Sequence, residues 1–168
     1  AARINRTTVW SSPYDMDGII SMAGVETDLA IAIFSELDGD MLTVRTDVVY
    51  ENGSESGDKI VVYLLESGVI HEQTNYYNSD ATSPFYQLGN PIPNFVHNEA
   101  LRLSLTEVLG DNISATAELE EFTKVFTVAI PEAVVDIANL SLVAMVVNAD
   151  NTAKNAQYAY LNEDKAYE

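Results

Sequence analysis

Hydrophobic and polar residues alternate along much of this chain, and a two-residue period is typical of β-strands with one buried face. Residues 41–51 show this pattern most clearly. The predicted inward face holds Leu42, Val44, Val48 and Tyr50, and the predicted outward face holds Thr43, Arg45, Asp47 and Glu51. Residues 27–36 also have strand character. The turn Asp38-Gly39-Asp40 between the two segments predicts a β-hairpin.

Further strands are predicted along the rest of the chain. Residues 59–66 and 140–147 are apolar on both faces, which indicates central, covered strands. Strand character also appears in 96–106 and near 155–161. Residues 114–119 and 122–130 resemble a second hairpin that closes around Glu120-Glu121. The long segment 67–95 lacks a clear period and is predicted to be an irregular loop.

One amphipathic helix is predicted over residues 13–23. Ser12 is its candidate N-cap, with Pro13 at the first helical position and Asp15 completing a capping-box pattern. The apolar stripe consists of Met16, Ile19, Ile20 and Ala23, and Gly24 is placed to end the helix. We therefore divide the chain into an N-terminal linker and helix, 1–24, and a strand domain, 25–168.

These elements predict an all-β fold, an antiparallel β-sandwich with one short N-terminal helix. No alternation of strands and helices points to a parallel sheet. A chain of 168 residues can bury roughly 70% of its unfolded surface, which suffices for a core. The sequence does not determine the strand order, so immunoglobulin-like and jelly-roll-like topologies both remain open.

Charge and cysteine content narrow the functional classes. The chain has 26 Asp and Glu against 8 Lys and Arg, a net charge of −18, and this excess repels nucleic acids and anionic lipid surfaces. The absence of cysteine excludes disulfides and thiol chemistry within these residues. No apolar run is long enough for a membrane-spanning helix. We therefore expect membrane attachment only through an anchor outside this chain.

No catalytic, metal-binding or cofactor-binding set is predicted. His71 and His97 are the two histidines, and neither belongs to a recognisable nucleophile or metal motif. The turns Asp15-Met16-Asp17-Gly18 and Asp38-Gly39-Asp40 lack the ligand run of a twelve-residue calcium loop. Among 26 acidic residues, carboxylate pairs of the glycosidase type occur by chance and have no diagnostic value.

The predicted binding residues are four aromatic side chains in the irregular segment, Tyr76, Tyr77, Phe85 and Tyr86. Pro84, Pro91 and Pro93 stiffen the same segment. Exposed rings on a stiff loop could stack on a sugar or anchor a protein partner. The alternative is that the rings fold back as a lid over the edge or bottom of the sandwich.

Several segments resemble the C-terminal part of the outer membrane protein 28 family of Bacteroidetes. The resemblance rests on the order and spacing of Lys59–Ile70 followed by Gln73, His97–Arg102, Leu140–Val147, Asn155-Ala156-Gln157 and the acidic tail. It implies an exported outer membrane lipoprotein with an adhesin-like surface role. Proteins of similar arrangement often carry an upstream thioredoxin-like domain, and Arg3–Arg6 look like the tail of one. The chain has no C-x-x-C motif, so redox activity is not implied.

The sequence thus favours a non-enzymatic binding or structural module of the cell envelope, located at the outer membrane or cell surface. Its expected partner is an unknown protein or glycan. One alternative is a glycan-acting hydrolase that uses loop carboxylates. Another is a passive spacer for a thioredoxin-like domain in the precursor.

Overall fold

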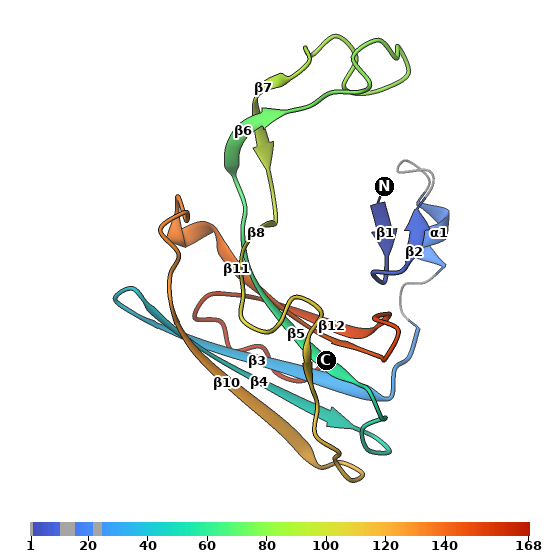
Figure 1. The fold of residues 1–168 in the computed structure, drawn as a ribbon, viewed down its shortest axis with the longest axis vertical. Coiled ribbons are helices and arrows are strands. Elements are labelled where there is room, and N and C mark those ends of the chain that lie inside the picture. The colour runs from blue at the N-terminus through green and yellow to red at the C-terminus, as the bar shows by residue number, and fades with distance from the viewer. Residues whose placement is uncertain (1, 11–15, 22–24) are drawn as a thin grey trace.

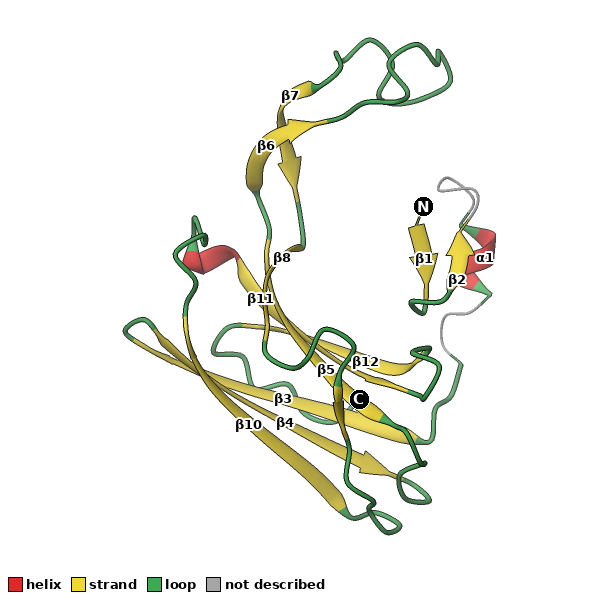
Figure 2. Ribbon diagram, in the orientation of Figure 1, coloured by secondary structure: helices red, strands yellow, loops and turns green. Residues whose placement is uncertain are grey.

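The computed structural model describes residues 2–10, 16–21 and 25–168. Antiparallel strands make up about half of these residues, and the two largest sheets face each other across one hydrophobic core (Figures 1 and 2). The predicted all-β sandwich is therefore confirmed. Within the described residues, no helix has the length and apolar character needed to cross a bilayer.

The smaller sheet has the order β10-β4-β3. Its strands are β3 (Leu29–Asp38), β4 (Met41–Tyr50) and β10 (Glu121–Ala129). β3 and β4 form the predicted hairpin, and Gly39 at φ +62° makes the turn. The predicted inward residues of β4 are fully buried. The free edge of β3 is covered by the C-terminal segment, since Ile33 and Lys165 exchange backbone hydrogen bonds.

The larger sheet has the order β12-β11-β5-β8. Its strands are β5 (Lys59–Glu66), β8 (Ala100–Ser104), β11 (Leu140–Val147) and β12 (Ala153–Tyr160), and the short β9 (Asp111–Asn112) pairs with the start of β5. β5 and β11 are central, as their apolar pattern predicts. Val62, Leu64, Leu142 and Ala144 are buried in the core.

The strand order decides between the two topologies that the sequence left open. β3 and β4 are adjacent, β5 crosses to the opposite sheet and pairs with β8, and β10 returns to pair with β4. β11 crosses back to pair with β5, and β12 follows it as a hairpin. This sequence of crossings is immunoglobulin-like.

Three predicted segments differ in the structure. Segment 67–95 is partly ordered into strands, because β6 (Val69–Gln73) pairs with β7 (Ile92–His97). Segment 96–106 is not one strand, because Asn98 and Glu99 separate β7 from β8. Residues 114–119 form no strand. Thr116 instead exchanges two hydrogen bonds with Ser54. The Thr116 N–H donates to the Ser54 hydroxyl at 2.9 Å, and the Ser54 N–H donates to the Thr116 hydroxyl at 3.1 Å.

The N-terminal region contains a hairpin of β1 (Ala2–Ile4) and β2 (Thr8–Trp10), followed by α1 (Asp17–Ile20). The hairpin contacts the β11–β12 turn, where the hydroxyls of Thr7 and Thr152 lie 3.0 Å apart. The predicted apolar stripe is not packed on the sandwich, because Met16 and Ile20 are exposed. Ser12, Pro13, Asp15, Ala23 and Gly24 lie outside the described residues.

Asp47, predicted to face water, is buried on the outer face of β4. Its carboxylate pairs with Arg45 Nε at 3.0 Å and accepts a 2.8 Å hydrogen bond from the Thr123 hydroxyl. Tyr167 donates to Glu121 on the neighbouring β10. Tertiary contacts thus cover a position that the local pattern assigns to solvent.

A buried carboxylate, Glu66, fastens the end of β5. Its Oε2 accepts a 2.6 Å hydrogen bond from Arg102 Nε, and its Oε1 accepts from the N–H groups of Val135 (2.9 Å) and Asp136 (2.7 Å). Burial raises the pKa of Glu66. The Asp136 N–H, Arg102 and the Val135 N–H together lower it by more than burial raises it, so the net pKa lies below its ordinary value.

This lowered pKa predicts a specific acid dependence. A carboxylate with a depressed folded-state pKa stabilises the protein above the ordinary value of 4.5 and loses that contribution as the pH falls through the folded pKa. The unfolding free energy of the wild type should therefore fall more steeply below about pH 5 than that of Glu66→Gln. Urea unfolding at several pH values measures both slopes. The exposed control Glu132→Gln should show the same pH dependence as the wild type. If the unfolding free energies of Glu66→Gln and the wild type fall in parallel with pH, Glu66 is not the source of the acid dependence.

Candidate functional site

A bent hairpin extends the sandwich in one direction. We call residues 67–99 the arm: β6 continues from β5, residues 74–91 form the arm tip, and β7 leads back into β8. The arm leaves the ends of β5 and β8 and projects away from both sheets (Figure 1). It carries all four of the predicted binding residues.

The base of the arm is fixed by hydrogen bonds across the hairpin. The Ser67 hydroxyl donates to Glu99 Oε1 at 3.0 Å and accepts from the Glu99 N–H at 3.1 Å. The Gly68 N–H donates to Asn98 Oδ1 at 3.1 Å. Gly68 has φ +75° and Glu99 has φ +54°, so both strands bend at the same level. These contacts set the direction in which the arm leaves the sandwich.

Asn75, a buried residue, organises the arm tip. Its Nδ2 donates to the carbonyls of Phe85 (2.8 Å) and Gly89 (2.9 Å), and its Oδ1 accepts from the Tyr77 N–H (3.0 Å). Three backbone positions far apart in the tip are thereby held by one side chain. This amide substitutes for the missing sheet ladder and gives the tip a defined conformation.

The arm tip contains a small, mostly apolar cleft of about 230 Å³. Its walls are Gln73, Thr74, Asn75, Tyr76, Tyr77, Phe85, Ile92 and Phe95. The Phe85 and Phe95 ring centroids are 6.2 Å apart, and the His97 ring lies edge-on to Phe95 at 5.0 Å. A continuous aromatic row therefore runs from β7 into the cleft.

Three of the four predicted aromatic residues meet at this cleft. Tyr76 is 87% exposed and Tyr77 is 43% exposed, while Phe85 is half-buried. Tyr86 is 39% exposed but does not line the cleft, and its hydroxyl accepts from Gln87 Nε2. The rings do not form a lid over the sandwich, because they lie on the projecting arm.

Sequence reasoning missed Ile92 and Phe95, which complete the cleft from β7. Both residues belong to a segment that was predicted to be irregular up to residue 95. Ile92, Phe95 and His97 share one face of β7, since the register opposes them to Gln73, His71 and Val69 of β6. A two-residue period would have been the sequence signal for Ile92 and Phe95 as neighbours on one strand face. A bulge between their pairs interrupts that period, so the signal is lost.

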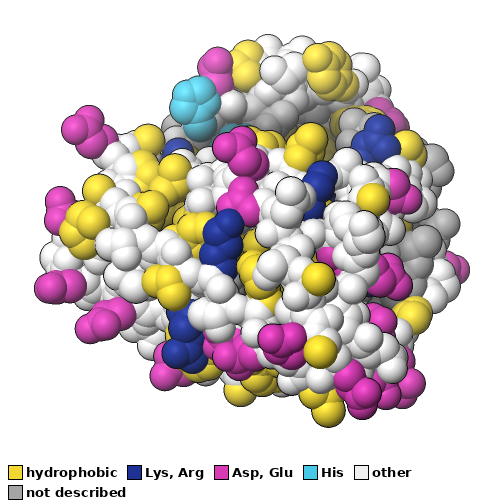
Figure 3. All heavy atoms as spheres, turned by 60° about the horizontal axis from the view of Figure 1, so that its bottom comes forward, with side chains coloured by type: hydrophobic (Ala, Val, Ile, Leu, Met, Phe, Trp, Pro, Cys, Tyr) yellow, Lys and Arg dark blue, Asp and Glu magenta, His cyan; other side chains and the backbone are white. Residues whose placement is uncertain are grey.

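The arm differs from the rest of the chain in charge. No Lys or Arg occurs between Lys59 and Arg102, and β6, the tip and β7 together hold two acidic residues, Glu72 and Asp80. Figure 3, in which the end opposite the arm is turned forward, shows Asp and Glu side chains spread over that face. A charge-poor projection on a protein of net charge −18 has the composition of an interface core.

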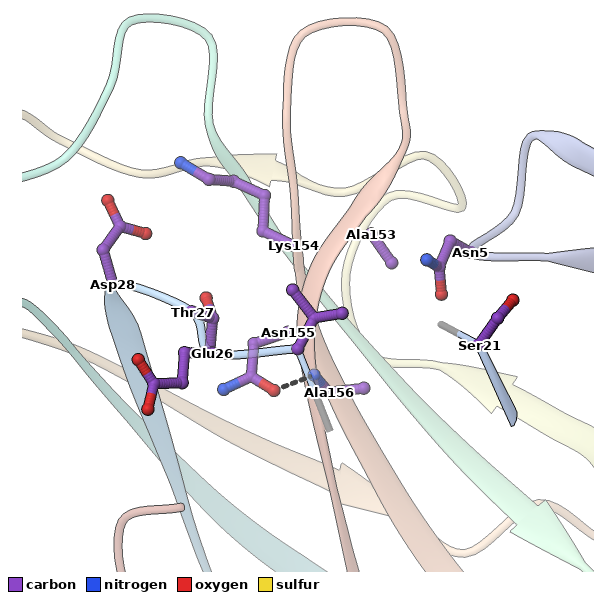
Figure 4. A pocket seen from close by; sticks show the side chains of 10 residues that line it. Asn5, Ser21, Glu26, Thr27, Asp28, Ala153, Lys154, Asn155 and Ala156 are labelled. Carbon is purple, nitrogen blue, oxygen red and sulfur yellow. Dashed lines mark hydrogen bonds between the residues drawn. The ribbon is translucent and has the colours of Figure 1, made fainter. Parts of the chain in front are cut away.

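A second hollow, of about 750 Å³, lies between the N-terminal hairpin and the sandwich. Asn5 and Ser21 line one side, and Asp28 lies across from them (Figure 4). The Lys154 side chain extends from β12 towards the Asp28 side. Its Nζ lies 3.2 Å from Glu55 Oε2 and 3.3 Å from Asp58 Oδ2, so its charge is already engaged.

The histidines are not joined in a reactive group. His97 packs against Phe95, and His71 Nδ1 lies 3.3 Å from the carbonyl of Glu72. Across residues 2–10, 16–21 and 25–168, no three His, Asp or Glu side chains gather as metal ligands would. The arm cleft itself is lined by neutral side chains alone.

Comparison with known proteins identifies the family. Residues 1–165 match the model of the family described as outer membrane protein Omp28. No curated protein matches significantly. HBP35 of Porphyromonas gingivalis is similar in structure, with a TM-score of 0.60, 14% identity, and coverage of 88% of this chain and 45% of HBP35.

A domain of the outer membrane lipoprotein Omp28 from the same organism has a TM-score of 0.51 and 17% identity, with coverage of 82% of this chain and 91% of that domain. At these identities the two structures support the fold alone. This chain spans less than half of the HBP35 structure. Because the family match covers nearly every residue, the chain belongs to the outer membrane protein Omp28 family and is an exported protein of the outer membrane.

Proposed function

We propose that this chain is a non-enzymatic binding module of the outer membrane that presents the arm tip to a protein partner, in an adhesin-like role. The observation that carries the proposal is the aromatic cleft at the end of a projecting, charge-poor arm. Exposed Tyr rings around a desolvated centre are the usual anchors of protein interfaces.

Hydrogen-bonding capacity favours a protein over a glycan. Asn75 uses its amide within the tip, and Gln73 Nε2 donates to the Thr74 carbonyl at 2.9 Å. A sugar needs several partners for its hydroxyls, and the Asn75 side chain already uses both of its N–H groups within the tip. A ring-sized apolar side chain needs none, and a cleft of about 230 Å³ has room for one.

The proposal that the chain has no enzymatic activity is supported by how its buried carboxylates are used. Glu66 is paired with Arg102, and Asp58 is paired with Lys154, so each is neutralised within the fold. A glycan-acting hydrolase would instead need two carboxyl groups across a substrate cleft. We also propose a lipid anchor, because the related Porphyromonas gingivalis Omp28 is described as an outer membrane lipoprotein.

Site-specific photo-crosslinking in cells tests the arm tip. A benzophenone amino acid in place of Tyr76 should give a discrete higher-mass adduct. The same probe in place of Val125, which is 56% exposed on the outer face of β10, should not. Protease sensitivity of the added mass identifies a protein partner. An added mass that remains on the probe-containing peptide after protease digestion, and that periodate cleaves, would identify a glycan and reverse this part of the proposal.

Matched substitutions provide the control for stability. Tyr76→Ser in a chain that carries the benzophenone amino acid at position 77 should reduce adduct yield about 30-fold, the effect of losing an interface hot spot. Tyr160→Ser, which removes a ring that is 61% exposed on β12, should leave the yield unchanged. Both variants should melt like the wild type, because exposed rings contribute little to folding. Equal yields from the two variants would refute the arm tip as the binding surface.

A further inference from the structure

We propose that the arm binds its partner by strand addition: an extended, uncharged or basic peptide segment pairs with the free edge of β6 and places one apolar side chain in the tip cleft. This inference rests on the proposed function, since it specifies what the arm tip recognises. It adds a backbone recognition mode and the chemistry of the bound segment.

The arm is a sheet of two strands, and within residues 2–10, 16–21 and 25–168 no other strand pairs with the outer edge of either one. A two-stranded ribbon is the least stable form of sheet and gains ladder hydrogen bonds from a third strand. The rest of the sandwich does not supply that strand, because the arm projects away from it (Figure 1). The edges are therefore open to a segment from another chain.

The two edges differ in their ability to accept a strand. β7 is interrupted by Pro93, which has no N–H, and by Asn94 at φ +54°. β7 also contains a bulge. Between the pairs His71–Phe95 and Gln73–Ile92, β7 advances by three residues while β6 advances by two. Proline and bulges are devices that blunt an edge. β6, Val69–Gln73, contains neither proline nor a residue with positive φ.

The open edge and the cleft are continuous. Gln73 ends β6 and also lines the cleft, and the next four residues, 74–77, form the adjoining wall. Side chains on an added strand alternate between its two faces. The side chains of the added strand that lie on the same face as Gln73, Ile92 and Phe95 are next to the aromatic row. A residue of the added strand that pairs near Gln73 therefore reaches the cleft.

The charge of the arm specifies the bound segment further. Glu72 on β6 and Asp80 in the tip carry negative charge, and no cation lies between Lys59 and Arg102. Asp80 is ionised at neutral pH, since the Thr82 hydroxyl and N–H lower a pKa whose ordinary value is already 3.8. An acidic segment is repelled by both groups, whereas Lys or Arg flanking the apolar residue is attracted.

Displayed random linear peptides, selected on the immobilised full chain, are the probe. The selected peptides should share an apolar ring residue with neutral or basic neighbours. In the tightest binder, each backbone nitrogen is then methylated in turn. Strand addition predicts a period of two, with methylation at alternate residues weakening binding about tenfold or more and methylation between them having little effect. Replacing the flanking basic residues by Glu should also weaken binding, most at low salt.

The outcomes separate this inference from the proposed function. Binding that is lost with Tyr76→Ser but shows a flat methylation profile overturns strand addition and keeps the arm tip as the site. Equal binding to wild type and Tyr76→Ser overturns both. Failure to select any peptide on the wild type counts against strand addition, because a free edge with a side-chain cleft should recover one. Increased amide-exchange protection confined to β6 in the complex is the expected independent readout.

Discussion

Replacing Arg102 by Met is expected to lower the free energy of unfolding by about 3–5 kcal/mol. The substitution leaves the buried Glu66 carboxylate with two backbone N–H donors, from Val135 and Asp136, and no cation. A buried charge without its partner loses the attraction that compensated its removal from water. Urea unfolding followed by circular dichroism measures the change, with an unaltered slope expected for a two-state transition.

A second substitution tests whether the isolated charge causes this loss. In Arg102→Met with Glu66→Leu, both charges are gone, and most of the stability should return, because an apolar pair of similar volume is tolerated in such sites. The N–H groups of Val135 and Asp136 can then turn to water, since both residues are exposed. Lys165→Met, which breaks a surface pair with Glu163, should cost less than about 1 kcal/mol. A double variant no more stable than Arg102→Met would refute the explanation.

Replacing Lys154 by Met should have a comparable effect at the other end of the sandwich, again about 3–5 kcal/mol. Asp58 is buried, and its Oδ1 has no hydrogen-bond partner among the described residues, so it depends on the interactions of Oδ2. Oδ2 accepts from Lys154 Nζ at 3.3 Å and from the Glu55 N–H at 3.2 Å. Without Lys154, only neutral donors remain beside a buried negative charge, the Glu55 N–H and the neighbouring Tyr50 hydroxyl.

The pKa of Lys154 gives the sign of the pH dependence. Burial lowers this pKa, but hydrogen bonding and attraction from Glu55 and Asp58 outweigh burial, so the net pKa is raised. The contribution is therefore fully present below the ordinary lysine value of 10.5 and is lost as the pH rises through the folded pKa. Adding Asp58→Asn to Lys154→Met should restore most of the stability at neutral pH. If Lys154→Met proves as mild as Lys165→Met, the buried Lys154–Asp58 pair contributes no more to stability than a surface pair.

The sequence predicted the sandwich because burial of one strand face is a local, periodic property. Leu42, Val44 and Val48 are separated by even numbers of residues on one strand, so their common face follows from strand geometry alone. The doubly apolar segments 59–66 and 140–147 were recognised as central strands for the same reason. The four aromatic residues were also visible in the sequence, because their clustering in a segment that contains prolines needs no tertiary information.

The tertiary structure decided which of those aromatic residues form one cleft and where it points. Phe95 packs against Phe85, which lies ten residues earlier in the sequence. The hydrogen bond between Ser67 and Glu99, which are 32 residues apart, fixes the direction of the arm. Asp47 and Glu66 are polar residues that the fold buries by means of partners from other strands. Strand order likewise depends on crossings between the sheets. Local periodicity specifies which face of a strand avoids water, but partners distant in sequence are selected by the free energy of the assembled core, which no short window of residues contains.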